Sequence, residues 1–323
     1  MTQLPGQQSK PVALCLMGPT AAGKTTVALE LAAQRNVQLV SVDSAQVYRG
    51  MDIGTGKPDP EVQRQFPHRL MDIRDPSEPY SAADFRADAI NEIKDIQQSG
   101  GIPLLVGGTM LYFKTLRDGL ADMPQADAQT RLQITEKAEQ EGWPAVHAWL
   151  AQVDPESAAR IHPNDPQRMQ RALEIYLVSG RTMTQFHAES RVQNSKTDNT
   201  LPFSLAFFAI QPPDRGILHK QIEQRFLGML SAGFVEEVRA LHQRGDLHER
   251  LPSIKSVGYR QVWQYLDGTL DYDGMVEKSI IATRQLAKRQ FTWMRNWGDL
   301  TSLSGTTAQS TATILKFVDS IAI

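Results

Sequence analysis

The sequence predicts an α/β protein in which a parallel sheet forms the core and an all-helical domain is inserted into it. Short apolar runs, such as residues 12–17 and 102–106, have the length and composition of buried strands and alternate with helix-forming segments. Between residues 122 and 200, helical segments follow one another without a strand. We therefore expect a core of residues 1–121 and 201–323 with residues 122–200 inserted.

Composition sets limits on the class of protein. The chain has 323 residues, of which 41% are hydrophobic, so it can bury a sizeable core. Its polar start and short first apolar run predict a cytoplasmic protein with no membrane partner. The single cysteine, Cys15, excludes an intramolecular disulfide and a zinc site built on cysteine pairs. The net charge of -2 excludes a uniformly basic surface and leaves room for a local basic patch.

The first strand leads into the sequence GPTAAGKT, which fits the phosphate-loop pattern G-x-x-x-x-G-K-[ST]. In this pattern backbone N–H groups surround a polyphosphate, the lysine contacts the phosphates and the hydroxyl serves a magnesium ion, here Thr25. Helix formers follow at residues 27–34, so the core resembles that of the P-loop NTPases. The loop alone does not distinguish a diphosphate from a nucleotide such as ATP. Its expected binding residues are Gly18, Pro19, Thr20, Ala21, Ala22, Gly23, Lys24 and Thr25.

Two polar residues follow the next expected strands. Asp43 ends the strand at residues 38–43, and Thr109 follows the strand at residues 102–106 after two glycines. The carboxyl ends of parallel strands line the ligand crevice, so both side chains should face whatever the loop binds. Asp43 is a candidate catalytic residue or the cap of a turn, and the Thr109 hydroxyl binds substrate or caps a helix.

A loop rich in Gly and Pro occupies residues 51–61. Its G-x-G lacks the third glycine and the helix of a dinucleotide fingerprint, which excludes a Rossmann fold. Thr55 and Lys57 could contact an anionic substrate from this loop, although a solvated lysine is an equally good interpretation.

Several helices are marked by their ends. Ser81 is the expected N-cap of a helix over residues 81–99, and Gly100 its stop. In the insertion, Asp165 and Pro166 should begin a helix that places Arg168 and Arg171 on one face. Positive charge near a helix N-terminus opposes the helix dipole, which suggests an external anion, with a solvated face as the alternative.

The C-terminal part is helical and basic. We expect one helix over residues 218–244, and residues 278–298 contain no acidic residue but carry Lys and Arg interleaved with Phe and Trp. That pattern is typical of a helix along a phosphate backbone, and equally of an amphipathic helix with solvated charges. Residues 301–323 should form a polar linker and a short apolar helix.

Together the motifs resemble the tRNA dimethylallyltransferases, also called tRNA isopentenyltransferases. The matching segments cover most of the chain in order: GPTAAGKT, SVDSAQVYRGMDIGTGKP, VGGTMLYFK, HPNDPQRMQRALE, SVGYRQVW and ATRQLAKRQFTWMR. The chain ends without the cysteine pairs of the zinc finger that eukaryotic members carry, so it resembles the bacterial form.

The resemblance implies transfer of a dimethylallyl group from dimethylallyl diphosphate to the exocyclic amine of the adenine just 3′ of the anticodon, with release of diphosphate. It implies Mg²⁺ as cofactor, the tRNA anticodon stem-loop as partner and, in our expectation, a monomer. Asp43 takes the family's position of general base, Thr109 that of the threonine at the acceptor site, and Arg225 that of an arginine that stabilises the diphosphate.

By the same resemblance, tRNA contacts are expected in the strand-end turns, the insertion and the C-terminal helices. They are Asp43, Ser44, Ala45, Gln46, Thr109, Arg131, Gln167, Arg168, Met169, Gln170, Arg171, Lys255, Ser256, Val257, Gly258, Tyr259, Arg260, Lys288, Arg289, Gln290, Phe291, Thr292, Trp293, Met294 and Arg295.

Two other functions use the same loop. One is an ATP-dependent kinase acting on a small molecule or nucleoside, which would need neither the basic C-terminal helix nor the helical insertion. The other is a nucleic-acid-binding NTPase, for which the strand ending at Asp43 would serve as the metal-binding strand.

Overall fold

The computed structural model describes residues 10–196, 201–212 and 214–321, and divides the chain into two compact units. Residues 1–118 and 201–323 form the first, which we call the sheet unit, and residues 119–200 form the second, the helical unit. The end of the expected insertion, residues 197–200, lies outside the described residues.

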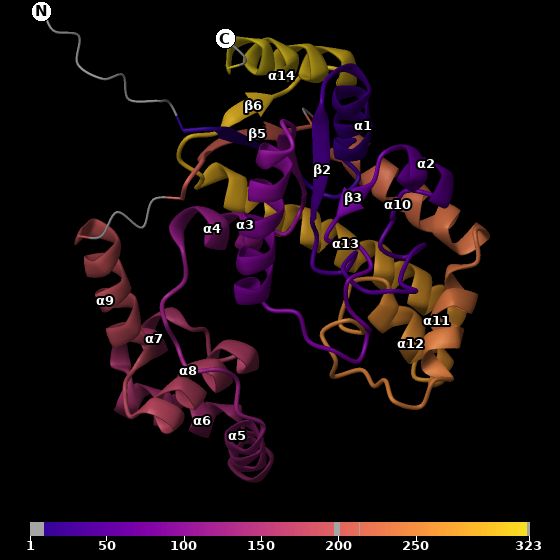
Figure 1. Ribbon diagram of the computed structural model, residues 1–323. Helices are drawn as coiled ribbons and strands as arrows, with labels where there is room; N and C mark the ends of the chain where they lie inside the picture. The colour runs from indigo at the N-terminus through magenta and orange to yellow at the C-terminus, as the bar shows by residue number, and fades with distance from the viewer. Residues whose placement is uncertain (1–9, 197–200, 213, 322–323) are drawn as a thin grey trace, which may run out of the picture. The chain divides into compact units, whose positions relative to one another are not determined.

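A parallel sheet forms the centre of the sheet unit, as predicted (Figure 1). Among the described residues it has six strands in the order β3-β2-β4-β1-β5-β6, and every neighbouring pair is parallel. The strands are β1 (Val12–Met17), β2 (Val37–Val42), β3 (His68–Arg69), β4 (Ile102–Gly107), β5 (Ser204–Ile210) and β6 (Thr301–Leu303).

The sheet is apolar on both faces because successive side chains of a strand point to opposite sides. In β1, Ala13, Cys15 and Met17 belong to one buried cluster, whereas Leu14 and Leu16 belong to another. Helices α1 (Lys24–Gln34) and α14 (Thr307–Ile321) cover the face of Leu14, and lie side by side in Figure 1. The opposite face packs against α3, α4 and the helices that follow β5.

Helix α3 (Ala82–Gln98) shows how local sequence sets the helix ends in this unit. The Ser81 hydroxyl accepts a hydrogen bond from the Asp84 N–H, and the Asp84 carboxylate accepts one from the Ser81 N–H. This capping box satisfies two N–H groups that the helix itself cannot bond. Gly100 then leaves the helix at a φ of 74°. Both ends were predicted.

The single helix expected over residues 218–244 is wrong: two helices occupy the segment. Helix α10 (Arg215–Ser231) ends before Gly233, which has a φ of 97° and begins α11 (Phe234–His242). A left-handed residue cannot continue a right-handed helix, although the apolar spacing runs on across it. The other helices of this unit are α2 (Pro60–Gln65), α4 (Met110–Asp118), α12 (Tyr259–Leu266) and α13 (Tyr272–Arg295).

The C-terminal segment also differs from its prediction, because part of the expected linker is strand β6. The strand pairs with β5, Phe208 lying opposite Thr301. Helix α14 has 15 residues and buries Ile314 and Val318. An ion pair between Arg35 and Asp319, at 2.9 Å, joins α14 to the end of α1.

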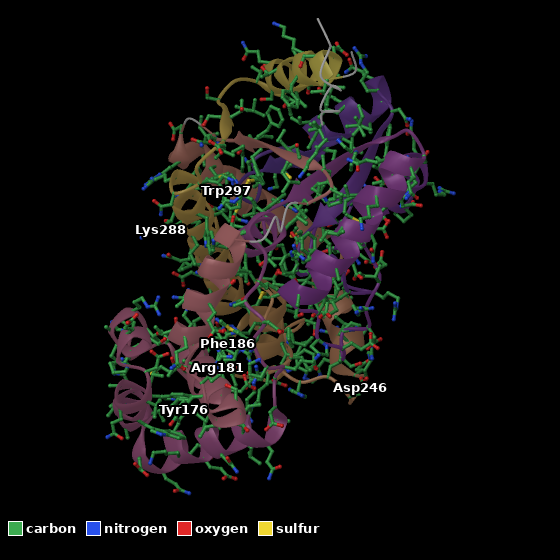
Figure 2. All side chains as sticks on the ribbon, turned by 60° about the vertical axis from the view of Figure 1, so that its left-hand side comes forward. Tyr176, Arg181, Phe186, Asp246, Lys288 and Trp297 are labelled. Carbon is green, nitrogen blue, oxygen red and sulfur yellow. The ribbon has the colours of Figure 1, made fainter. Side chains whose placement is uncertain are left out.

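Among the described residues the helical unit contains no strand. Its helices are α5 (Ala128–Glu141), α6 (Trp143–Val153), α7 (Pro155–Arg160), α8 (Pro166–Ser179) and α9 (Met183–Lys196). Ile134, Leu150 and Met169 meet in its core. As predicted, Asp165 caps α8 by accepting the Arg168 N–H. Figure 2 labels Arg181 and Phe186, whose guanidinium and ring lie 4.4 Å apart.

Candidate active site

One cavity of about 510 Å³ lies within the sheet unit at the carboxyl ends of β1, β2 and β4. Each of these strands delivers a sequence-predicted residue to its wall: Lys24 from the phosphate loop, Asp43 after β2 and Thr109 after β4. Helix α10 adds Arg225. Residues far apart in the chain therefore meet at one edge of the sheet, as the strand-end argument predicts for the first three.

The phosphate loop takes its shape from two residues with positive φ, Ala21 at 62° and Gly23 at 84°. The Lys24 ammonium folds back over the loop and donates hydrogen bonds to the carbonyl oxygens of Gly18 and Pro19, at 3.0 and 2.7 Å. Burial, reinforced by the positive charge of Arg225 and opposed by Asp43, lowers the pKa of Lys24 to about 8. An anion that enters the cavity would therefore stabilise the charged form of Lys24.

Asp43 is a half-buried residue that lines the cavity. Its Oδ1 accepts hydrogen bonds from the N–H groups of Ala45 and Gln46, at 2.9 and 3.4 Å. Removal of the carboxylate from water raises the pKa of Asp43, and these N–H groups together with Lys24 and Arg225 offset part of that rise. The result is a more basic carboxylate than usual, held in one orientation.

Close backbone approach brings Thr109 beside Asp43. A Cβ on Gly107 would lie 2.0 Å from the carbonyl oxygen of Val42, so a glycine is needed where β4 passes β2. The Thr109 N–H then donates to that Val42 oxygen at 3.2 Å. The Thr109 Oγ1 accepts a hydrogen bond from the Ser44 N–H at 3.0 Å. Thr109 thus connects β4 to the turn that holds Asp43.

Arg225 is a cation of the cavity wall without a carboxylate partner. No hydrogen bond or ion pair joins its side chain to another described residue, and loss of hydration lowers the pKa of Arg225 while the charge of Asp43 raises it. Gly56 makes room for it, since a Cβ there would lie 1.9 Å from the Arg225 Nη2. An unpaired guanidinium in a cavity is suited to bind an anion.

Neither interpretation of Lys57, in the loop after β2, is right. The Lys57 ammonium is buried and donates to Asp52 and Asp72, at 2.7 and 2.5 Å, so it neither faces solvent nor is free for a substrate. The Thr55 hydroxyl donates to the Met51 carbonyl at 2.7 Å, and Thr55 lines the cavity, so its predicted contact with a substrate stays a prediction. These contacts explain why a loop with so much Gly and Pro keeps one shape.

The sequence did not point to Glu237, although it holds this loop in place. Its carboxylate accepts the N–H groups of Asp52, Ile53 and Gly54, at 2.9, 2.7 and 3.2 Å, and the Tyr259 hydroxyl at 2.6 Å. Glu237 belongs to an amphipathic helix in which a glutamate is unremarkable, so no local signal identifies it.

The basic helix α13 presents cations at its surface. Lys288, Arg289 and Arg295 are exposed, and none is paired with a described residue. Figure 2 shows Lys288 on the outer side of the helix. Arg289 and Trp293 also line the cavity, as does Lys255 from the loop before α12. Thr292, next to Trp293 in the sequence, is exposed, and so is Arg260 of α12. The Phe291 ring is half-buried, and the Arg215 guanidinium lies 5.9 Å from its centre.

Several residues predicted to contact tRNA have little exposed side chain or bond within the protein, although Gln46, Gly258 and Tyr259 line the cavity. Tyr259, Met169 and Met294 are at most 3% exposed and belong to apolar cores, and Gly258 is buried. Tyr259, Met169 and Met294 each lie next to an exposed arginine of the same helix, as expected for helices with one buried face. Gln46 likewise bonds internally, to Ser41 and to the Thr55 carbonyl.

In the helical unit the predicted arginines have protein partners. Arg131 and Arg171 donate to the buried carboxylate of Glu174, at 2.8 and 2.7 Å. Burial disfavours charge on Glu174, but these hydrogen bonds and the Asp127 N–H lower its pKa. Arg168 differs, because its side chain is 73% exposed and lies 3.4 Å from Asp165.

Exposure varies among the other predicted residues of α8. Gln167 is exposed, whereas Gln170 donates to the Arg131 carbonyl and to Thr135. Arg168, Gln167 and Arg171 border a hollow of about 560 Å³ within this unit.

A parallel sheet with a phosphate loop, a basic carboxylate and an unpaired arginine in one cavity defines a phosphate-loop enzyme of group transfer. A family model described as IPP transferase matches residues 46–297. The chain therefore belongs to the IPP transferase family and is a prenyltransferase.

Solved structures agree. The chain is similar to the tRNA isopentenylpyrophosphate transferase of Bacillus halodurans, with 32% identity over 97% of this chain and 96% of that one, and a TM-score of 0.69. It is similar to the tRNA delta(2)-isopentenylpyrophosphate transferase of Staphylococcus epidermidis, with 31% identity over 96% and 99% and a TM-score of 0.67. A eukaryotic dimethylallyltransferase acting on tRNA matches with 26% identity over 91% and 74% and a TM-score of 0.70. The kinase alternative is not favoured.

Proposed function

We propose that this protein transfers a dimethylallyl group from dimethylallyl diphosphate to the exocyclic amine of the adenine 3′ of the anticodon in tRNA. The proposal rests mainly on one observation: Lys24 and Arg225, whose side chains make no hydrogen bond to a carboxylate, line the same cavity as Asp43 and Thr109. The cations suit the diphosphate, and the carboxylate and hydroxyl suit the acceptor. The family and the tRNA enzymes among its solved structures support the same substrates.

The leaving group is the part of the reaction that the phosphate loop serves. As the carbon–oxygen bond to diphosphate breaks, negative charge develops on the departing oxygen. Lys24, Arg225 and the loop N–H groups stabilise that charge in a site that is already formed. Apolar side chains of Ile222, Met229 and Leu286 in the same cavity suit the branched hydrocarbon group.

Asp43 serves the acceptor. The lone pair of an adenine amine is delocalised into the ring, so the amine is a weak nucleophile until its proton is removed. In our proposal the nitrogen–carbon bond forms while Asp43 takes the proton, with Thr109 beside it to orient the amine. General base catalysis contributes typically ~10²- to 10⁴-fold, and a raised pKa improves the base at neutral pH.

The residues present fit a magnesium ion. Thr25 lines the cavity and is exposed, and its hydroxyl makes no hydrogen bond to another described residue, so the hydroxyl oxygen is free to act as a ligand. Mg²⁺ is commonly held by one or two protein oxygens together with substrate phosphates and water. When bound, the ion would neutralise diphosphate charge. No group of three or more His, Cys, Asp or Glu in the described parts of the chain forms a separate metal site.

The tRNA is recognised, in this proposal, by exposed cations. Lys255, Arg289 and Trp293 border the cavity, and Arg168 of the helical unit is exposed on its own surface. Cations neutralise backbone phosphates, while rings such as Trp293 offer stacking to bases that have left the helix. The target adenine must be turned out of the anticodon loop to reach Asp43.

We also propose a cytoplasmic, monomeric enzyme, as the sequence predicts. Among the described residues, none of the helices has the length and apolar character needed to cross a membrane.

A direct experiment tests the reaction. The purified protein is incubated with Mg²⁺, dimethylallyl diphosphate and an anticodon stem-loop, without ATP, and the RNA is analysed by mass spectrometry. We expect one dimethylallyl group on a stem-loop with adenine 3′ of the anticodon and none when guanine replaces it. No product, together with ATP-dependent phosphorylation of a small acceptor, would contradict the proposal.

A further inference from the structure

Gln290 connects the two loops that the proposed reaction must hold apart. It lies in α13 and is 6% exposed. Its Oε1 accepts a hydrogen bond from the Thr20 N–H in the phosphate loop, at 2.9 Å. Its Nε2 donates to the carbonyl oxygen of Gly108, also at 2.9 Å. Each end of the amide therefore makes one hydrogen bond within the protein.

The two partners of Gln290 belong to opposite sides of the reaction. Thr20 lies in the loop that would hold the leaving diphosphate, and Gly108 precedes Thr109 at the acceptor side. We propose that Gln290 is a positioning residue that fixes the distance between the phosphate loop and the Thr109 loop. This inference rests on the proposed function. Transfer needs the amine and the breaking bond in line, and a misplacement of about 1 Å can cost ~10²-fold in rate.

Only a glutamine satisfies both partners at this length. Glutamate has no N–H for the Gly108 carbonyl, asparagine is one methylene shorter, and methionine fills the space without either hydrogen bond. Gly108 is equally constrained, because a Cβ there would lie 2.4 Å from the Gln290 Nε2. Gly108 has no positive φ, so alanine is compatible with its backbone and would displace the amide from the opposite side.

The Thr20 N–H distinguishes positioning from damage to the phosphate loop. While Gln290 accepts this N–H, the group is not available to a phosphate oxygen. Removing the amide frees it, so diphosphate binding should stay as strong or become stronger, whereas transfer should slow. A variant that merely distorted the loop would be impaired in both.

The test compares Gln290→Met and Gly108→Ala with the unmodified protein and with Gln285→Met. Gln285 is an exposed glutamine of the same helix that lines neither cavity, and its side chain makes no hydrogen bond to a described residue. Titration calorimetry measures the Kd of inorganic diphosphate with Mg²⁺, and rapid-quench experiments measure the single-turnover transfer rate to the stem-loop. Thermal unfolding checks each fold.

We expect both site variants to transfer at least about tenfold more slowly, with the Kd of diphosphate unchanged within about twofold or lower. Gln285→Met should match the unmodified protein in both measurements. If Gln290→Met transfers at the same single-turnover rate as the unmodified protein, this inference alone is overturned. A loss of rate in Gln290→Met that is matched by an equal loss of diphosphate affinity also overturns this inference alone. No transfer by the unmodified protein overturns the proposed function, and this inference with it.

Discussion

Thr109 Oγ1 accepts a hydrogen bond from the Ser44 N–H at 3.0 Å, although the two residues lie 65 positions apart in the chain. Ser44 follows Asp43 directly, so the hydrogen bond holds the hydroxyl and the carboxylate in one rigid group. The backbone beneath them is equally fixed, because Gly107 packs on Val42 at the end of the neighbouring strand. An acceptor amine placed between Thr109 and Asp43 would therefore meet a preformed site rather than order one on binding.

The role of Asp43 can be tested by its pH dependence. Removal from water raises the pKa of this carboxyl, so the basic form is lost at a higher pH than for an ordinary aspartate as the solution is acidified. We expect the single-turnover rate to fall as the pH drops through that raised pKa. Asp43→Asn should reduce the rate by ~10²-fold or more and remove the acidic limb. If Asp43→Asn kept the full rate or an unchanged acidic limb, Asp43 would be excluded as the base. Filter binding to the stem-loop checks that the variant still binds tRNA.

Lys24 sets an alkaline limit on diphosphate binding. In the free protein its pKa of about 8 means that it is charged below that pH and neutral above it. The Kd of inorganic diphosphate should therefore increase as the pH rises through 8. Lys24→Arg keeps its charge across this range, so its binding curve should be flat there even if its affinity is lower overall. If the Kd of both proteins changed at the same pH, the change would belong to a group other than Lys24.

Much of the fold follows from local sequence, and the exceptions have physical reasons. β1, β2 and β4 are apolar runs of the length and composition of buried strands, and all three were predicted close to their observed ends. β3 and β6 have only two and three residues. Their composition does not mark them as strands, and they become strands by pairing with a neighbouring strand. Gly233 separates two helices although the apolar spacing continues across it. The spacing does not reveal the φ of 97° that this glycine adopts in the fold.

The candidate site divides in the same way. The phosphate loop, Asp43 and Thr109 were placed by a motif and by strand-end reasoning, both of which depend on local order along the chain. Arg225 came only from family resemblance, since one arginine in the middle of an amphipathic helix carries no signal. Glu237 and Gln290 act across 183 and 270 positions, respectively, and were not predicted in these roles. Long-range hydrogen bonds of this kind leave no periodic pattern to detect.

Gly56 should be required for the position of Arg225. In Gly56→Ala the new Cβ would lie 1.9 Å from Nη2, and the flexible end of the arginine would move. We expect the Kd of diphosphate to rise about tenfold, which corresponds to ~1.4 kcal/mol. Gly50→Ala is the matched control, because its φ of +71° resembles the +65° of Gly56 and no atom lies within 4 Å of its Cβ.

Both alanine variants should be destabilised by about 1 kcal/mol in the free energy of unfolding, measured in urea, because each places a side chain in the left-handed region. Only Gly56→Ala should bind diphosphate more weakly. Equal affinities in the two variants would show that Arg225 does not contribute to that site.

The basic face of α13 makes tRNA binding sensitive to salt. Lys288 and Arg289 are exposed and unpaired with any described residue, so each is free to neutralise a phosphate of the tRNA backbone. Replacing either by alanine should weaken tRNA binding and reduce the slope of log K against log salt concentration by about 0.7 to 0.9 for each phosphate that is no longer neutralised. Filter binding at several salt concentrations measures this slope. Lys316→Ala removes an exposed lysine from α14, on the other face of the sheet, and should leave the slope unchanged. If the α13 variants retained the full slope, Lys288 and Arg289 would lie outside the tRNA interface and their charges would serve only to solvate the helix.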